Sequence, residues 1–329
     1  MVKRSSVSTL ADLYKIMLKI RLVEQKIIDL YPTDKIQSPV HLSVGQEAVS
    51  AGVCLPLRPT DHLYGTYRGH GVYLAKGGDL KKMFAELYGK DSGCARGKGG
   101  SMHLVAPEVG LMGCSAIVSS TIPVATGDAL ASQMQSRKRV VVSFFGDGAV
   151  DEGVFYESVN FAVLKKLPIL FVCENNGYAI HSKVSDRHAQ TKLYNLCSGL
   201  GLPGKRYDGD DAGLVFKTVS AAVEDIRKGG GPRLLEFMTY RRLEHVGPGM
   251  DGPAETYRAP NEARRALASD PLTRAKAALT KKNSGVSLKQ LDSWELEIRR
   301  DIEEAVKFAE VSPFPAPGKL LDHLYAPTA

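Results

Sequence analysis

The chain has 329 residues, of which 43% are hydrophobic and 24% are charged, with a formal net charge of +7 at pH 7. This composition is typical of a soluble globular protein with one or two domains, and the absence of long apolar runs or clustered basic residues argues against a membrane span and nucleic-acid binding. Its five cysteines include no C-x-x-C pair, which disfavours zinc and disulfides and indicates a reducing, cytoplasmic compartment.

The first third of the chain predicts helices separated by loops. Apolar residues recur at helical spacing from Leu10 to Tyr31, where Thr9 is a candidate cap and Pro32 ends the pattern. We expect a loop–helix–loop passage over 41–68. A helix is predicted over 80–88 and is followed by a glycine-rich stretch over 89–100. The segment 113–131 is expected to begin as a loop and to become a helix of small residues.

A strand–helix–strand pattern follows in the middle of the chain. Residues 140–145 form an apolar run typical of a buried strand, and glycines on both sides of Asp147 turn the chain after it. An apolar helix is expected over 154–164 and a second buried strand over 168–173. Because a crossover places two parallel strands side by side, Asp147 and Asn176 are expected at the same carboxyl edge of the sheet.

These two residues have the chemistry of a metal site. A carboxylate and an amide oxygen are hard donors that suit Mg²⁺ or Ca²⁺, and Mg²⁺ commonly takes phosphate oxygens as its other ligands. Gly146 and Gly148 leave space for a diphosphate, which the free N–H groups of the next helix can bind. The G-x-G-x-x-G turn of dinucleotide sites and the G-x-x-x-x-G-K-[ST] loop are both absent from the sequence.

The last third predicts one more helix and strand, then a helical end. A helix is expected over 218–227 and a core strand over 233–238. Three glycines and three prolines over 247–260 indicate a mobile loop beside the site. Charged helices are expected over 261–309, followed by an extended Pro-rich segment over 312–317.

Several motifs together resemble a known family. Gly146-Asp147-Gly148 with Asn175-Asn176 resembles the thiamine-diphosphate signature. The motifs over 41–48, 66–71 and 97–103, with Tyr240-Arg241, resemble the alpha subunit of thiamine-diphosphate-dependent 2-oxo acid dehydrogenases. The resemblance extends from about Leu13 to the region of Asp270, and Gly45-Gln46-Glu47 is closer to the pyruvate and acetoin branches.

The resemblance implies the cofactors thiamine diphosphate and Mg²⁺ and a role for each matching residue. The implied metal ligands are Asp147, Asn176 and the carbonyl of Tyr178. The implied cofactor-binding residues are Tyr67, Arg68, Val118, Asp147, Gly148, Ala149, Asn176 and His245. The implied catalytic histidines, which line the channel, bind diphosphate or move protons, are His41, His70 and His245.

The chain departs from the family pattern after Tyr240-Arg241. Leu243 replaces a histidine of many members, Glu244 adds a negative charge, and Val246 replaces a serine that is phosphorylated in some of them. His245 retains the second histidine. These changes bear on the substrate and on regulation rather than on the cofactor.

The expected fold is α/β, a parallel-sheet thiamine-diphosphate-binding fold with helices on both faces. Residues 1–260 are expected to form this domain and residues 261–329 a helical C-terminal extension packed on it. By resemblance, the glutamate that activates the cofactor's pyrimidine belongs to a separate beta subunit. The expected partner is therefore this beta subunit, in an assembly of two alpha and two beta chains, with an acyltransferase core as a further partner.

The function implied is oxidative decarboxylation of a short, pyruvate-like 2-oxo acid. Three alternatives remain open at this point. The first is a thiamine enzyme outside the 2-oxo acid complexes, cleaving acetoin or serving a biosynthetic carboligation or decarboxylation. The others are a nucleotide-binding dehydrogenase on the same broad fold and a non-catalytic scaffold.

Overall fold

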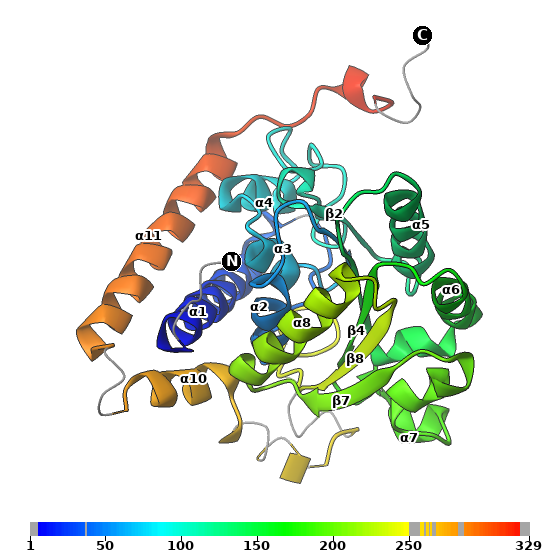
Figure 1. The fold of residues 1–329 in the computed structure, drawn as a ribbon. Helices are drawn as coiled ribbons and strands as arrows, with labels where there is room; N and C mark the ends of the chain where they lie inside the picture. Colours follow the sequence, from blue (N-terminus) through cyan, green and yellow to red (C-terminus); the bar gives the residue numbers. More distant parts are fainter. Residues whose placement is uncertain are drawn as a thin grey trace.

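A parallel β-sheet forms the centre of the computed structural model (Figure 1), which describes residues 6–36, 38–249, 257–259, 261–262, 264, 268–281 and 286–322. The sheet has six strands in the order β2-β1-β3-β4-β8-β7, and each neighbouring pair is parallel. The strands of this sheet are β1 (His62–Thr66), β2 (Leu111–Ser115), β3 (Val141–Gly146), β4 (Ile169–Asn175), β7 (Gly204–Asp208) and β8 (Arg233–Met238). A separate short hairpin consists of β5 (Tyr178–Ala179) and β6 (Ser182–Lys183).

Helices cover both faces of the sheet, as expected. The α-helices described are α1 (Ser6–Leu30), α2 (Glu47–Cys54), α3 (His70–Lys76), α4 (Leu80–Leu87), α5 (Thr121–Met134), α6 (Gly153–Leu164), α7 (Val184–Arg187), α8 (Ala212–Arg227), α10 (Pro271–Leu279) and α11 (Leu288–Val311). The 3₁₀ turns are η1 (Tyr31–Thr33), η2 (Pro107–Val109), η3 (Asp147–Asp151), η4 (Leu193–Leu200) and η5 (Pro317–Lys319). None of the helices in this part of the chain is long and apolar enough to cross a membrane.

The core has two layers because side chains alternate along each strand. Val142 and Phe144 of β3 pack in the layer that contains α1, α2 and α8, whereas Val141 and Phe145 pack against α5 and α6. Figure 1 shows α5 and α6 on one side of the sheet and α1, α2 and α8 on the other. This burial on both faces explains why the central strands are almost continuously apolar.

The predicted β-α-β unit is confirmed as β3–α6–β4. The register pairs Gly146 with Glu174, so the chain leaves both strands at the same edge. Asp147 begins η3 directly after β3, and Asn176 directly follows β4. The two residues therefore lie at the ends of adjacent strands, as the sequence predicts.

Other expectations were wrong in part. The first helix begins at Ser6 and so includes Thr9, which is not its cap, although it ends at the expected place before Pro32. Strands β1, β2 and β7 were not predicted, because they are short and carry glycine or charged residues rather than an apolar run. The loop expected from residue 113 is strand up to Ser115.

The C-terminal helices pack against the N-terminal ones. Asp270 caps α10 by accepting a hydrogen bond from Thr273 N at 3.0 Å, and α11 packs against α4 and α1 (Figure 1). The division at residue 260 stays a prediction. Most of the loop expected over 247–260 (residues 250–256 and 260) lies outside the described residues.

Candidate functional site

A cavity of about 390 Å³ lies at the carboxyl edge of the sheet. Its walls come from segments that follow β1, β2, β3, β4 and β8, together with the segment before α2. The residues proposed from sequence that line it are His41, Tyr67, Arg68, Val118, Asp147, Gly148, Ala149, Asn176, Tyr178 and His245. The topology therefore brings together residues from distant parts of the chain, at the place where open α/β sheets bind ligands.

Asp147 is the buried anion of this cavity. Only 1% of it is exposed, and burial raises the pKa of its carboxyl while Arg187 opposes that rise. Arg187 Nη2 lies 2.5 Å from Asp147 Oδ2, and Arg187 Nη1 lies 2.5 Å from Asp151 Oδ2. His188 Nε2 contacts the second oxygen of Asp151. A buried carboxylate needs such a countercharge, whether an arginine or a metal ion.

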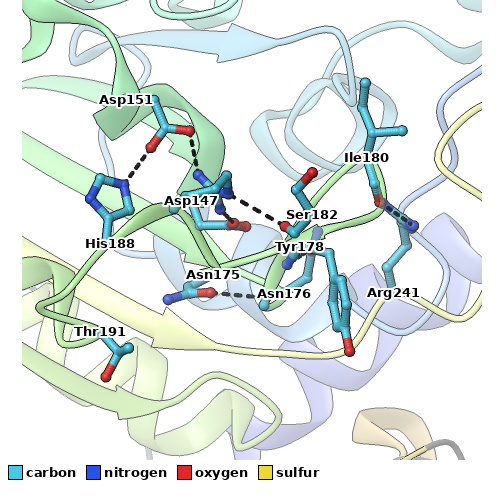
Figure 2. Close-up of polar contacts among 12 residues, drawn as sticks. Asp147, Asp151, Asn175, Asn176, Tyr178, Ile180, Ser182, His188, Thr191 and Arg241 are labelled. Atoms are coloured by element: carbon cyan, nitrogen blue, oxygen red, sulfur yellow. Dashed lines mark hydrogen bonds and ion pairs between the residues drawn. The ribbon is translucent and has the colours of Figure 1, made fainter. Parts of the chain in front are cut away.

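Asn176 and Tyr178 lie beside Asp147 in a tight turn (Figure 2). Gly177 has φ of 87°, and Tyr178 N donates to Asn176 Oδ1 at 3.2 Å. Asn176 Nδ2 donates to Gln46 Oε1 at 3.1 Å, which orients the amide. Asn175 turns away from the cavity and donates to Glu236. Of the Asn-Asn pair, only the second residue lines the cavity.

The turn after β3 leaves space for a ligand. A Cβ on Gly146 would meet nothing within 4 Å, whereas one on Gly148 would lie 2.9 Å from Ala179 Cβ. Ser119 Oγ donates to the Ala149 carbonyl at 2.8 Å and so ties the segment after β2 to η3. Glycine is required at 148 by close packing and fits at 146 because the cavity is open there.

Arg68 brings positive charge to the wall. Its guanidinium donates to Leu42 O at 2.6 Å and to His245 O at 3.2 Å, both of which are uncharged backbone groups. Burial lowers the pKa of Arg68. The guanidinium still carries its charge at neutral pH, since arginine is effectively always protonated, so it suits an anionic ligand.

Three aromatic rings form a cluster on the same side. His41 and Tyr67 have ring centroids 4.6 Å apart, His41 and His245 are 5.2 Å apart, and Tyr67 and His245 are 5.5 Å apart. Burial, with the nearby charge of Arg68, lowers the pKa of His41 to about 3 and that of His245 to about 4. Both imidazoles are therefore neutral near pH 7.

His70 is placed differently from the other two histidines. It is fully buried, its Nε2 lies 2.7 Å from Ser101 Oγ, and its Nδ1 lies 3.4 Å from Glu24 Oε1. It is not among the residues that line the cavity. The structure thus places it behind the wall, where it connects α3 to α1 and to the glycine-rich segment.

Several lining residues were not assigned a role from the sequence. Glu174 is half-buried, and desolvation raises the pKa of its carboxyl to about 8 although Arg68 opposes the rise. Glu174 Oε1 has no hydrogen-bond partner among the described residues. Gln46, Ser119 and Arg241 also line the cavity. The only sign in the sequence that these residues line the cavity is their position next to the motifs. The fold, and no local pattern, brings each of them to the cavity wall.

Apolar side chains stand at the mouth of the cavity. Ile117 is 67% exposed and Val118 45% exposed, although both line it. Neighbouring apolar residues that are exposed beside a cavity can form part of a surface that contacts a ligand or another chain. Val118, one of the implied cofactor-binding residues, is exposed at the open side of the cavity.

The arrangement fits Mg²⁺ and a diphosphate. Asp147, the Asn176 amide and the Tyr178 carbonyl supply hard oxygen donors, and Arg68 supplies a cation for phosphate. No group of three or more His, Cys, Asp or Glu able to hold a metal occurs among the described residues, so a site here depends on amide, carbonyl and phosphate oxygens.

Comparisons with known proteins agree on one family. The sequence model described as "Dehydrogenase E1 component" matches residues 14–318. The alpha subunit of acetoin:2,6-dichlorophenolindophenol oxidoreductase from Bacillus subtilis (strain 168) is 38% identical over 314 residues, which cover 95% of this chain and 92% of that protein. The pyruvate dehydrogenase E1 component subunit alpha of Rhizobium meliloti (strain 1021) is 38% identical over 305 residues, covering 92% and 86%. The mitochondrial somatic form of that subunit from Homo sapiens is 36% identical over 314 residues, covering 95% and 78%.

Proposed function

The chain belongs to the dehydrogenase E1 component family, as an alpha subunit of the thiamine-diphosphate-dependent oxidoreductases, and we propose that its cavity binds the cofactor's diphosphate through Mg²⁺. The observation that carries this proposal is the convergence of Asp147, Asn176 and Tyr178 with Arg68 on one cavity. The reaction is the oxidative decarboxylation of a short 2-oxo acid. The alternatives of a nucleotide-binding dehydrogenase and a scaffold are removed by the family assignment.

Each wall of the cavity has a part in this function. Thiamine diphosphate, when bound, supplies the nucleophilic carbon and the electron sink for decarboxylation. Asp147, Asn176 and the Tyr178 carbonyl hold the metal, and Arg68 with the N–H groups of Gly148 and Ala149 binds the diphosphate. Tyr67, the neighbour of Arg68, lines the same part of the cavity.

The two neutral imidazoles, His41 and His245, lie in the cavity wall, where they would contact the bound diphosphate or move protons during turnover. Their low pKa values keep both rings uncharged near pH 7, so each presents a neutral imidazole rather than a positive charge to the cavity. His70 lies behind the cavity wall and contacts Ser101, so in this proposal it supports the wall and does not touch the cofactor.

Alpha subunits of this family pair with beta subunits. We propose an assembly of two alpha and two beta chains, and an acyltransferase core as a further partner. By resemblance, none of the glutamates near the site is the one that activates the cofactor's pyrimidine, so the partner would supply it. Glu47 is paired with Arg21, Glu152 and Glu174 lie in the wall near η3 and β4, and Glu157 and Glu244 are not lining residues of the described cavity. We further propose a cytoplasmic location, on the basis of the five free thiols.

The substrate is proposed to be pyruvate or a similarly short 2-oxo acid, with acetoin as the second candidate. A relative named for acetoin matches the chain over 92% of its own length, which favours keeping this candidate. Leu243, which replaces the usual histidine, is buried, while Val246 is exposed. Neither residue lines the cavity as described, so the wall itself does not decide between the two substrates.

Co-expression with a beta-type partner tests the function. The purified assembly, given thiamine diphosphate, Mg²⁺ and an artificial electron acceptor, should oxidise pyruvate, another short 2-oxo acid or acetoin. Omission of Mg²⁺ should stop turnover. An assembly that binds thiamine diphosphate and oxidises none of these compounds would contradict the proposed substrates, and one that binds no cofactor would contradict the proposed site.

A further inference from the structure

Arg187 holds the central carboxylate of the cavity, although no motif in the sequence marks it. It is the last residue of α7, and its two terminal nitrogens lie 2.5 Å from Asp147 Oδ2 and 2.5 Å from Asp151 Oδ2. Its Nε donates to Ser182 O at 3.4 Å. One guanidinium thus bridges the two acidic side chains that begin and end η3.

The bridge reaches Asp147 from outside the cavity. Asp147 lines the cavity wall, but Arg187 is not among the lining residues that the structure describes. The bond uses Oδ2, so a cation in the cavity is left with Oδ1. A planar fork that binds two carboxylates also fixes the direction of both, which a single point charge cannot do.

Arg187 is itself fixed by its surroundings. His188 Nε2 holds the other oxygen of Asp151, as Figure 2 shows, so Asp151 is anchored on both sides. Val184 N donates to Gly177 O at 3.0 Å, and β5 pairs with β6 just before α7. The stretch from Asn176 to Arg187 is therefore one folded unit that carries both the Tyr178 carbonyl and the arginine.

We propose that Arg187 is a positioning residue for the metal-binding carboxylate of Asp147, with Asp151 and His188 as its anchors. The proposal rests on the proposed function, because it takes Asp147 as a metal ligand. Residues that hydrogen-bond a metal's ligands orient them, and losing one typically costs about 10–100-fold in metal affinity or activity.

A competing role for Arg187 predicts a change of metal affinity in the opposite direction. If the guanidinium occupied the position of the metal, it would compete with the cation, and its removal would strengthen metal binding. If it orients Asp147 from behind, its removal weakens metal binding. The direction of the change in affinity therefore decides between the two roles.

The test is a titration of the full-length chain, together with its beta-type partner and thiamine diphosphate, with Mn²⁺. Electron paramagnetic resonance measures the free and bound Mn²⁺ at each step. Arg187→Gln should bind Mn²⁺ about 10–100-fold more weakly than the wild type. Arg187→Lys keeps the charge but cannot bridge both carboxylates, so it should restore only part of the affinity. Asp151→Asn, which loosens the anchor, should weaken binding by a smaller factor.

Arg233→Gln is the matched control. Arg233 makes an ion pair of the same length, 2.5 Å, with Asp225 at the opposite end of β8, far from the cavity. The Arg233→Gln variant should bind Mn²⁺ with the affinity of the wild type. The melting temperatures of all variants distinguish unfolding of the chain from a loss of orientation of Asp147. If Arg187→Gln does not fold, the Mn²⁺ affinity of Asp151→Asn tests the positioning role instead.

Wild-type or tighter Mn²⁺ affinity in Arg187→Gln would overturn the positioning role, and so would equal weakening by Arg233→Gln. Failure of the proposed function looks different. In that case the wild type itself binds no Mn²⁺ in this cavity, or Asp147→Ala binds it as well as the wild type does.

Discussion

The imidazole of His41 is buried between Tyr67 and His245 and carries no charge near neutral pH. Its pKa is lowered to about 3 by burial and by Arg68, whereas an exposed histidine in the unfolded chain titrates near 6.5. Below pH 6.5 the unfolded chain therefore binds a proton that the folded chain does not. The contribution of His41 to stability is full above pH 6.5 and is lost as pH falls toward 3.

His41→Phe should for this reason be less sensitive to acid than the wild type. The expected difference in the pH dependence of the unfolding free energy is at most about 1.5 kcal/mol between pH 6.5 and 5. Urea unfolding of the cofactor-free chain at both pH values measures it. Parallel pH profiles for the two proteins would contradict the low pKa.

Asp147 and Asn176 give the sharpest prediction for ligand binding. Asp147→Ala or Asn176→Ala should weaken Mg²⁺-dependent binding of thiamine diphosphate by more than about 100-fold, because each removes a direct metal ligand rather than an outer residue. Calorimetry measures the affinity, and Asp225→Ala, an exposed acidic residue outside the cavity, is the control. Wild-type affinity in both variants would show that the metal binds elsewhere.

The sequence predicted many of the lining residues but missed others for a clear physical reason. The glycines around Asp147 and the paired asparagines mark a local turn, which a motif can reveal. Glu174 lies within a buried strand, and Arg187 on a short polar helix, so each resembles an ordinary residue of its element. Their proximity to the cavity comes from packing between segments distant in sequence, which local patterns do not encode.

At the level of elements, the segment before α2 meets the segment after β8 at a glycine. Gly45 has φ of 97°, and a Cβ there would lie 2.4 Å from the Tyr240 carbonyl oxygen. Arg242 N donates to Val44 O at 3.0 Å beside it. This contact holds the His245 segment against the wall that contains His41 and Gln46.

Gly45→Ala should destabilise the protein by more than about 1 kcal/mol, because it adds a clash to a disfavoured backbone conformation. It should also weaken cofactor binding, since the two walls separate. Gly127→Ala is the control, because Gly127 lies on α5 and a Cβ added there would meet nothing within 4 Å, so its stability should stay equal or rise slightly. Chemical denaturation of both variants makes the comparison, and equal stabilities would count against the close contact.

Prediction of elements succeeded where burial on both faces produced a long apolar run. β3, β4 and β8 are such strands, and α6 between them shows helical spacing. β2 and β7 are the edges of the sheet and pair on one side only, so their sequences tolerate glycine and charge. A strand whose stability comes from pairing with a neighbour has a weak signature of its own.

At the level of the whole molecule, we expect the exposed apolar residues at the cavity mouth, Ile117 and Val118, to contact the beta-type partner. Ile117→Asp should weaken assembly with the beta-type partner by about tenfold or more, because it places a charge in an apolar contact. Leu296→Asp is the matched control, since Leu296 is 72% exposed on α11, away from the cavity. Size-exclusion chromatography with light scattering follows both, and undiminished assembly by Ile117→Asp would place the interface elsewhere.

The residues that line the cavity extend from His41 to His245 along the chain, so the complete cavity exists only when the sheet has brought these segments together. A ligand that binds there recognises only the folded chain, and mass action then transfers its binding energy to the fold. At a concentration about 100 times its dissociation constant, such a ligand adds about 2.7 kcal/mol to the free energy of unfolding. Destabilising substitutions far from the cavity should therefore be partly rescued by an ample supply of thiamine diphosphate and magnesium, and we expect the amount of folded protein to rise with the concentration of the cofactor.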